Sequence, residues 1–227
     1  MRATVLAAAV VLALAAAAHV LRYLLLLINR TTLLHPLVAN GALLVGILAS
    51  LAAIAAVIAA AAVSTSWLIG RRAAVFGSHG LDDPRPEWAL WAGCLIPVVN
   101  LVWAPVFVIE LARAEHSQSR LKTPVLTWWI AWVFSTGICL WATWTSGATE
   151  PQGVADNTVM AIIAYLAGLA TLLLLLRVVD IFVDRPVQRP LHRWVVVTGD
   201  DDSGGTDEPQ DDESRDAVES GDREPAA

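Results

Sequence analysis

Long apolar stretches that hold few charged residues constrain this chain more than any other feature of its sequence. The hydrocarbon core of a bilayer is about 30 Å thick, and about 20 apolar residues in an α-helix cross it. Stretches of that length recur along the chain, and 56% of its 227 residues are hydrophobic. A backbone at membrane depth must satisfy its own polar groups, which an α-helix does. The sequence therefore predicts an all-α integral membrane protein.

The apolar stretches and the polar connections between them predict a transmembrane helical domain over residues 1–197. It would hold four to five membrane-spanning helices. The predicted spans are residues 4–28, 37–69, 125–145 and 158–183, with a proline-broken segment at 88–112. The charged start and alanine-rich run of the first stretch are also typical of a signal peptide. The apolar character continues past Arg22, however, which makes this stretch long enough to span the membrane.

Charge is distributed unevenly along the chain. The formal net charge is −6, but residues 198–227 hold 12 acidic and two basic residues, so the first 197 residues carry a net charge of +4. Low hydrophobicity and high charge predict that residues 198–227 form a disordered acidic tail. Residues 185–194 precede this tail and repeat arginine every four residues, at Arg185, Arg189 and Arg193. We predict that this basic strip lies on anionic lipid headgroups.

The segment 88–112 combines an apolar composition with residues that a lipid-facing helix avoids. Pro97 and Pro105 each remove a backbone donor, and Asn100 between them carries a full amide. Such groups are tolerated at membrane depth where neighbouring helices or a water-filled recess satisfy them. Glu110 and Arg113 add charge at the end of the segment. These five residues form the candidate membrane-embedded polar site.

Two geometries fit this segment: a kinked span, or a re-entrant hairpin that leaves the membrane on the side it entered. A crossing would divide the basic residues between both sides, whereas a return would gather all of them on one side except Arg30 and at most Arg22. Because Lys and Arg in short loops mark the cytoplasmic side, the sequence favours the return. It places both termini in the cytoplasm. The alanine and arginine bias is typical of a high-GC bacterium, so we expect a bacterial plasma membrane.

Tryptophans and small residues predict further contacts of the helices. Trp and Tyr are enriched at both membrane interfaces, so we expect membrane-interface anchors at six positions. These are Trp67, Trp88, Trp128, Trp129, Trp141 and Trp144. The stretch 37–69 is dense in alanine and glycine, which let helices approach closely. It is expected to pack in the bundle interior, or against a protein partner or a second copy of the chain.

Chemistry-bearing motifs are absent from the sequence. It has no Gly-rich phosphate loop, no nucleophile with a base and no metal-ligand spacing, so we expect no enzyme, cofactor, metal or nucleic-acid partner. The leading hypothesis is a non-catalytic accessory or scaffold subunit of a cell-envelope or transport complex. The alternative is a small transporter or lipid-binding membrane protein that uses the segment around Pro97, Asn100 and Pro105 as its site.

The middle of the chain resembles the actinobacterial membrane family described as domain of unknown function 4328. The resemblance extends from Trp67 to Trp132. It rests on Trp67, Leu68, Arg71 and Arg72, on Trp88, Ile96, Pro97, Asn100, Leu101 and Pro105, on Glu110, Arg113 and Ala114, and on Trp128 with Trp129. The resemblance implies a membrane protein and no particular activity.

Overall fold

The computed structural model describes residues 1–33 and 35–184, and every regular element in these residues is a helix. They belong to one compact unit, Met1–Pro190. The predicted basic strip, with Arg185, Arg189 and Arg193, and the acidic tail lie outside the described residues.

Within the described residues, four helices are long and apolar enough to cross a membrane. They are α1 (Arg2–Asn29), α2 (Pro36–Ser78), α5 (Gln118–Trp144, continued by the short 3₁₀ helix η1, Thr145–Gly147) and α6 (Pro151–Val183). These helices confirm the predicted all-α membrane class. Each is longer than the span predicted for it, because hydropathy marks the apolar part of a helix whereas the backbone hydrogen bonds continue into polar residues.

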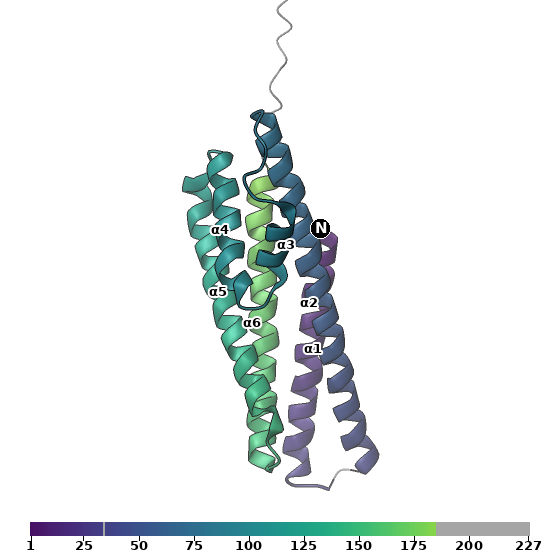
Figure 1. Ribbon diagram of the computed structural model, residues 1–227. Coiled ribbons are helices and arrows are strands. Elements are labelled where there is room, and N and C mark those ends of the chain that lie inside the picture. The colour runs from purple at the N-terminus through teal and green to yellow at the C-terminus, as the bar shows by residue number, and fades with distance from the viewer. Residues whose placement is uncertain (34, 185–227) are drawn as a thin grey trace, which may run out of the picture. The chain divides into compact units, whose positions relative to one another are not determined.

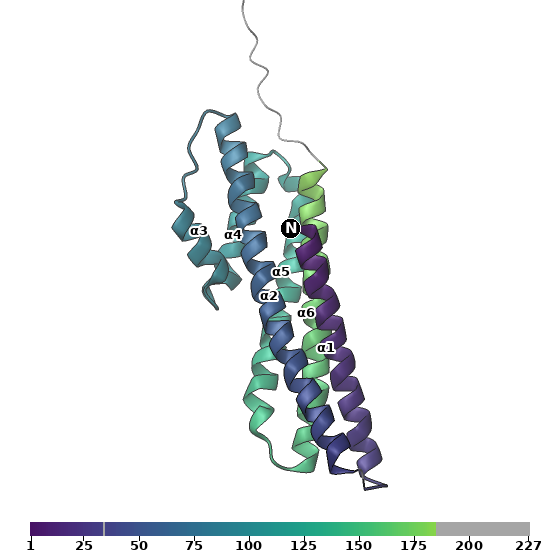
Figure 2. The ribbon, with the colours of Figure 1, turned by 90° about the vertical axis from the view of Figure 1, so that its right-hand side faces the viewer.

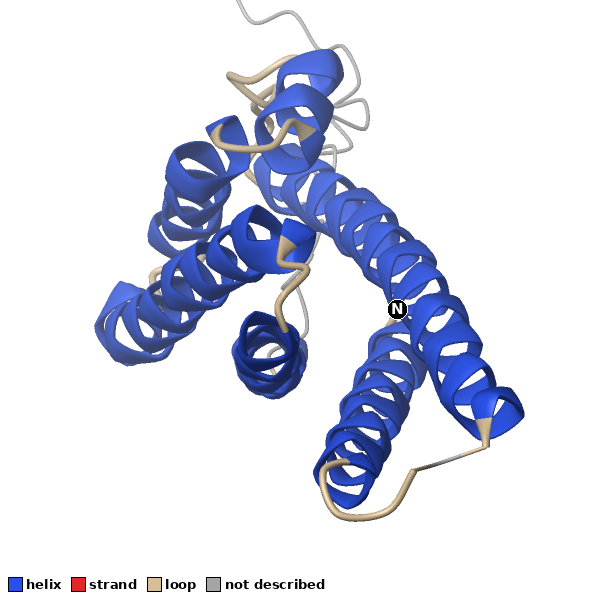
Figure 3. Cartoon of the chain, turned by 90° about the horizontal axis from the view of Figure 1, so that it is seen from below, coloured by secondary structure: helices blue, strands red, loops and turns tan. Residues whose placement is uncertain are grey.

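Helix α6 lies between α1 and α5 and contacts both of them, while α2 packs against α1. Figure 1 shows this order, with α2 and α5 on opposite sides of the bundle, and Figure 3 shows the helices from below. Helix α2 also packs against two shorter helices, α3 (Glu87–Leu95) and α4 (Val99–Ala114), and reaches α6 through side-chain contacts.

Small residues of α2 are buried in its contact with α1. Gly46, Ala53 and Ala60 recur every seven residues and are buried, and Ala53 and Ala60 belong to one core cluster with the alanines of α1. A seven-residue spacing keeps side chains on one side of a helix. The small residues predicted to pack in the bundle interior or against another chain therefore contact α1 of the same chain.

The segment predicted as broken forms a helical hairpin of α3 and α4, which lie side by side (Figure 2). Its turn, Ile96–Val98, lies partway along the bundle. A loop runs from the C-terminal end of α2 down to α3, and α4 runs back toward the same end of the bundle (Figure 1). Ion pairs from Arg72 to Asp83 before the hairpin and to Glu110 near its end fix this arrangement. The segment therefore turns back on itself instead of continuing along the bundle.

Candidate functional site

The hairpin turns at the first of its two prolines. Helix α3 ends at Leu95, Pro97 is exposed, and Val98 adopts a positive φ of 70° before α4 begins at Val99. A positive φ is unfavourable for a β-branched residue such as valine. Val98 is also 75% exposed, so this strained turn presents an apolar side chain to its surroundings.

Pro105 lies inside α4 and is buried. Because proline has no N–H, the carbonyl of Leu101, four residues earlier, loses its helical donor. The indole Nε1 of Trp129 on α5 donates a hydrogen bond to this carbonyl oxygen at 2.7 Å. A neighbouring helix thus satisfies the group that the proline frees, as the sequence predicted for such a break. Asn100, one residue before Leu101, is half-buried.

A glycine on α3 and an aromatic ring on α4 set the distance between the helices of the hairpin. A Cβ added to Gly93 on α3 would lie 2.6 Å from Cε2 of Phe107 on α4. Only a residue without a side chain allows α3 to approach α4 this closely.

A buried guanidinium joins the hairpin to α2. The Arg72 side chain is 0% exposed, and its Nε and Nη2 donate to the two carboxylate oxygens of Asp83, each at 2.8 Å. Its Nη1 donates to the Phe107 carbonyl at 3.1 Å and to Glu110 Oε2 at 3.3 Å. One side chain of α2 therefore holds both the loop before the hairpin and the second helix of the hairpin.

Arg85 completes this ion-pair network of Arg72, Asp83, Arg85 and Glu110. Its Nη2 donates to Glu110 Oε1 at 2.8 Å, and its backbone N–H donates to Asp83 Oδ1 at 3.0 Å. The guanidinium also lies 5.3 Å from the centroid of the Trp103 ring, within cation–π range. Two cations and two carboxylates neutralise one another, as buried charges require.

The electrostatics of the network favour the ionised form of Asp83. Partial burial by itself raises the pKa of this carboxyl group. The hydrogen bonds from Arg72 and from the Arg85 backbone, together with both positive charges, outweigh the burial and hold the pKa below its ordinary value.

A second clamp lies beside the network. Arg71 Nε donates to Glu115 Oε1 at 2.7 Å, and its Nη2 donates to the Phe182 carbonyl at 2.8 Å. It thereby joins α2 to the connection between α4 and α5 and to the end of α6. Consecutive arginines of α2 thus hold different elements, Arg72 the hairpin and Arg71 the bundle beside it.

The candidate residues from the sequence are only partly brought together. Glu110 belongs to the ion-pair network, whereas Arg113 is exposed on another side of α4. Pro105 lies one helical turn after Leu101, the residue whose carbonyl accepts the hydrogen bond from Trp129. Arg72, Asp83 and Arg85 are not among the residues predicted for the site, because the prediction considered only the apolar segment 88–112 and its end. One signal could have indicated them. Arg71 and Arg72 end an apolar stretch, and the loop and the apolar segment that follow each contain a carboxylate that could pair with an arginine.

The six tryptophans predicted as interface anchors lie in different environments. Trp88, Trp141 and Trp144 are strongly exposed, at 72%, 59% and 86%. Trp128 differs from the prediction, because it is buried in the core with its ring 5.1 Å from that of Trp132. The other two make specific contacts within the chain, which are an edge contact of Trp67 with the Phe182 ring and the hydrogen bond of Trp129.

Among residues 1–33 and 35–184, no group of three or more His, Cys, Asp or Glu side chains is arranged to hold a metal ion. The fold and the site define an all-helical membrane protein in which a buried ion-pair network holds a helical hairpin.

The model of the family described as Domain of unknown function (DUF4328) matches residues 30–183, and the chain belongs to this family. The match covers α2 to α6 and confirms the family resemblance of the Trp67–Trp132 region. Neither the curated proteins nor the solved structures contain a match to this chain.

Proposed function

We propose that this protein is a non-catalytic accessory or scaffold subunit of a cell-envelope or transport complex in a bacterial plasma membrane. The observation that carries the proposal is the use of the charged groups of the hairpin region within the chain itself. Glu110 pairs with Arg72 and Arg85, and Asp83 pairs with Arg72. Groups paired in this way stabilise one arrangement of helices, which suits a rigid assembly platform.

The distribution of basic residues supports a cytoplasmic location for the end of the bundle that holds the network. Arg71, Arg72 and Arg85 lie there, and Arg120 and Lys122 follow at the start of α5, whereas Arg30 follows the other end of α1. By the positive-inside rule, the hairpin would enter from the cytoplasmic side, which is also the side of both termini.

The length of α4 supports a hairpin that ends near the middle of the bilayer. Eleven residues separate Val99 at the turn from Glu110 in the network, which is about 16 Å of helix. With the network at the headgroup level, the turn lies about halfway through a hydrocarbon core of about 30 Å. The strong exposure of Val98 and of Val102 (62%) suits contact with lipid tails at this depth.

The N-terminal half of α2 is the surface that we propose for a protein partner or a second copy of the chain. Its small residues contact α1, and its opposite side carries exposed aliphatic side chains at helical spacing. These are Leu44 (57%), Leu48 (57%), Leu51 (58%) and Ile58 (61%). The contacts of this half with α1 and α6 lie on the side of its small residues, so the aliphatic side has room for another helix.

Co-purification tests the proposal. The full chain would be extracted in several mild detergents, and its mass would be compared with that of a variant carrying Leu48→Ser and Leu51→Ser. We expect a complex with the native chain and its loss in the variant. Recovery of the native chain as a lone monomer in every detergent would contradict the scaffold role.

Labelling of single cysteines tests the proposed topology independently. In a background with Cys94 and Cys139 replaced by serine, cysteines at positions 80 and 118 should react from the cytoplasmic side, and a cysteine at position 150 from the other side. Reaction at positions 80 and 118 from opposite sides would rule out the re-entrant hairpin.

A further inference from the structure

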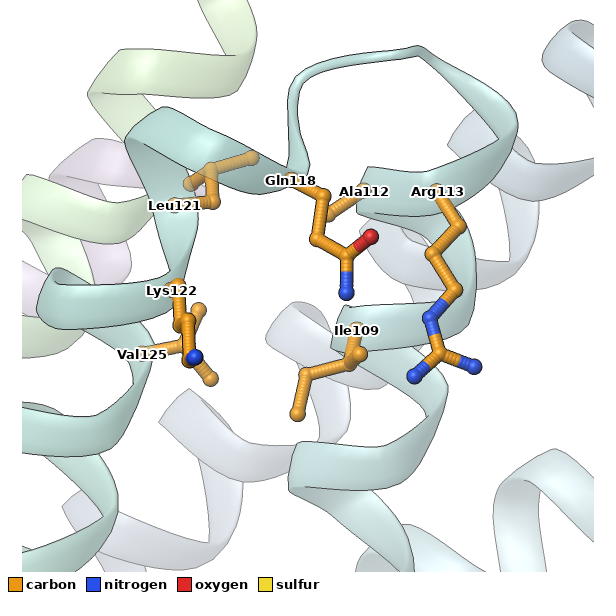
Figure 4. A pocket seen from close by; sticks show the side chains of 7 residues that line it. All are labelled: Ile109, Ala112, Arg113, Gln118, Leu121, Lys122 and Val125. Atoms are coloured by element: carbon orange, nitrogen blue, oxygen red, sulfur yellow. The ribbon is translucent and has the colours of Figure 1, made fainter.

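We propose that a hollow between the end of α4 and the start of α5 binds the phosphate of an anionic glycerophospholipid. The hollow has a volume of about 280 Å³. Arg113 from α4 and Gln118 and Lys122 from α5 provide its polar groups, and Figure 4 shows the Gln118 amide between the two cationic side chains. This site requires only that the chain is a membrane protein and goes beyond the scaffold role.

The charges of the hollow are complementary to a phosphate. No acidic residue lines it. Within the described part of the chain, the side chains of Arg113, Gln118 and Lys122 have no hydrogen-bond or ion-pair partner, and the acidic residues nearest in sequence are paired elsewhere: Glu110 with Arg72 and Arg85, and Glu115 with Arg71. An arginine fork with a nearby ammonium group is a common phosphate-binding combination.

The wall of the hollow is apolar and is formed by core residues. Ala112, Leu121 and Val125 are 2%, 1% and 2% exposed and belong to the core, and Ile109 packs against them. Pockets that enclose a drug-sized ligand have volumes of about 300–1,000 Å³. A hollow of about 280 Å³ therefore fits a phosphate with its glycerol backbone, and the acyl chains must lie outside it.

Two apolar stripes continue from the hollow in the direction that acyl chains would take. Each stripe begins at a cationic residue of the hollow, and its residues follow at spacings of four, three and four. These spacings keep the residues on one side of the helix. The stripes consist of Ile109, Val106 and Val102 below Arg113 on α4, and of Leu126, Trp129 and Val133 below Lys122 on α5. All except the half-buried Ile109 are between 37% and 62% exposed. A cationic end above two apolar stripes matches a lipid rather than free phosphate.

Native mass spectrometry of the full chain in detergent tests this proposal with phosphatidylglycerol and phosphatidylcholine as probes. We expect one phosphatidylglycerol to bind more tightly than any phosphatidylcholine. Each charge near an anionic lipid contributes about 1 kcal/mol, which is about a fivefold change in affinity. The variant carrying Arg113→Gln and Lys122→Gln should therefore bind phosphatidylglycerol about 25-fold more weakly.

The matched control carries Arg120→Gln and Arg177→Gln, which remove two exposed charges that do not line the hollow. We expect its affinity to stay within twofold of that of the native chain. Equal losses in both variants would mean general charge attraction and would overturn the site. Displacement of phosphatidylglycerol by millimolar inorganic phosphate would overturn the choice of a lipid.

A third variant separates binding from folding. Gln118→Glu keeps the shape of the side chain and places a negative charge beside the phosphate. A carboxylate in the first turn of a helix is favourable, so the unfolding temperature should not fall. We expect affinity to fall at least tenfold with unchanged unfolding, and unchanged affinity would overturn the proposal.

Discussion

The Arg72→Gln variant perturbs the contact between α2 and the hairpin most directly. Arg72 contacts Asp83, Glu110 and the Phe107 carbonyl, and its side chain is 0% exposed. Glutamine is shorter and neutral, so it cannot bridge the two carboxylates. Asp83 loses a bidentate partner, and Glu110 keeps only Arg85.

The size of the effect follows from how far water can replace the lost partner. Removal of one partner from a buried ion pair costs about 3–5 kcal/mol, because the remaining charge is left desolvated. The side chains of Asp83 and Glu110 are 17% and 26% exposed, and Arg85 still binds both residues. We therefore expect a loss in the free energy of unfolding near the lower limit, about 3 kcal/mol.

Hydrogen exchange followed by mass spectrometry locates this loss, and unfolding in denaturing detergent measures it. Exchange should rise over residues 79–114 while α1 and the first half of α2 keep their protection. Arg120→Gln is the control, because it removes an exposed arginine near the same end of the bundle. Adding Asp83→Asn to Arg72→Gln removes the unpaired charge and should regain part of the stability. A loss no larger than that of the control, or no recovery in the double variant, would refute the reasoning.

Three further predictions concern the other contacts of the hairpin. Trp129→Phe removes the donor to the carbonyl freed by the proline and should cost about 1 kcal/mol in unfolding experiments, whereas Trp144→Phe at an 86% exposed site should cost nothing measurable. Gly93→Ala forces α3 away from α4 and should cost about 1–3 kcal/mol, whereas Gly77→Ala, with no atom within 4 Å of the added Cβ, should be neutral or stabilising. Because the pKa of Asp83 is lower in the folded chain, its ionised form stabilises the fold at pH values above 3.8, the ordinary pKa of aspartate. This stabilisation is lost as the pH falls below 3.8 toward the lowered pKa. Unfolding measured between pH 6 and pH 3 should show this loss in the native chain and not in Asp83→Asn.

The sequence was sufficient to predict the helical membrane class, because long apolar stretches have few other solutions. It was also sufficient to favour a returning segment, because Pro97 and the positions of the arginines can be read directly from the sequence. The partners of Arg72 could not be predicted, since they lie 11 and 38 residues away and meet only after the hairpin has folded. Trp128 and Trp129 are adjacent, yet one lies in the core and the other binds α4, which depends on how α5 is rotated.

The contacts that hold the hairpin follow from the solvent that surrounds it. In water, burial of aliphatic side chains would keep α3 and α4 on the bundle. In the proposed topology lipid tails surround the hairpin, and because they are as apolar as valine they remove that driving force. Directional contacts remain: the ion-pair network at one end, the Trp129 hydrogen bond at Pro105, and the close approach at Gly93.

Shortening an exposed tip side chain tests this view. Val102→Ala, at a 62% exposed position on α4, should change the free energy of unfolding in a bilayer by less than about 0.5 kcal/mol. In water, the same helix surface would require cover, so the hairpin would associate with other apolar surfaces. A loss of 2 kcal/mol or more in a bilayer would show that aliphatic packing, and not the polar contacts, holds the hairpin in place.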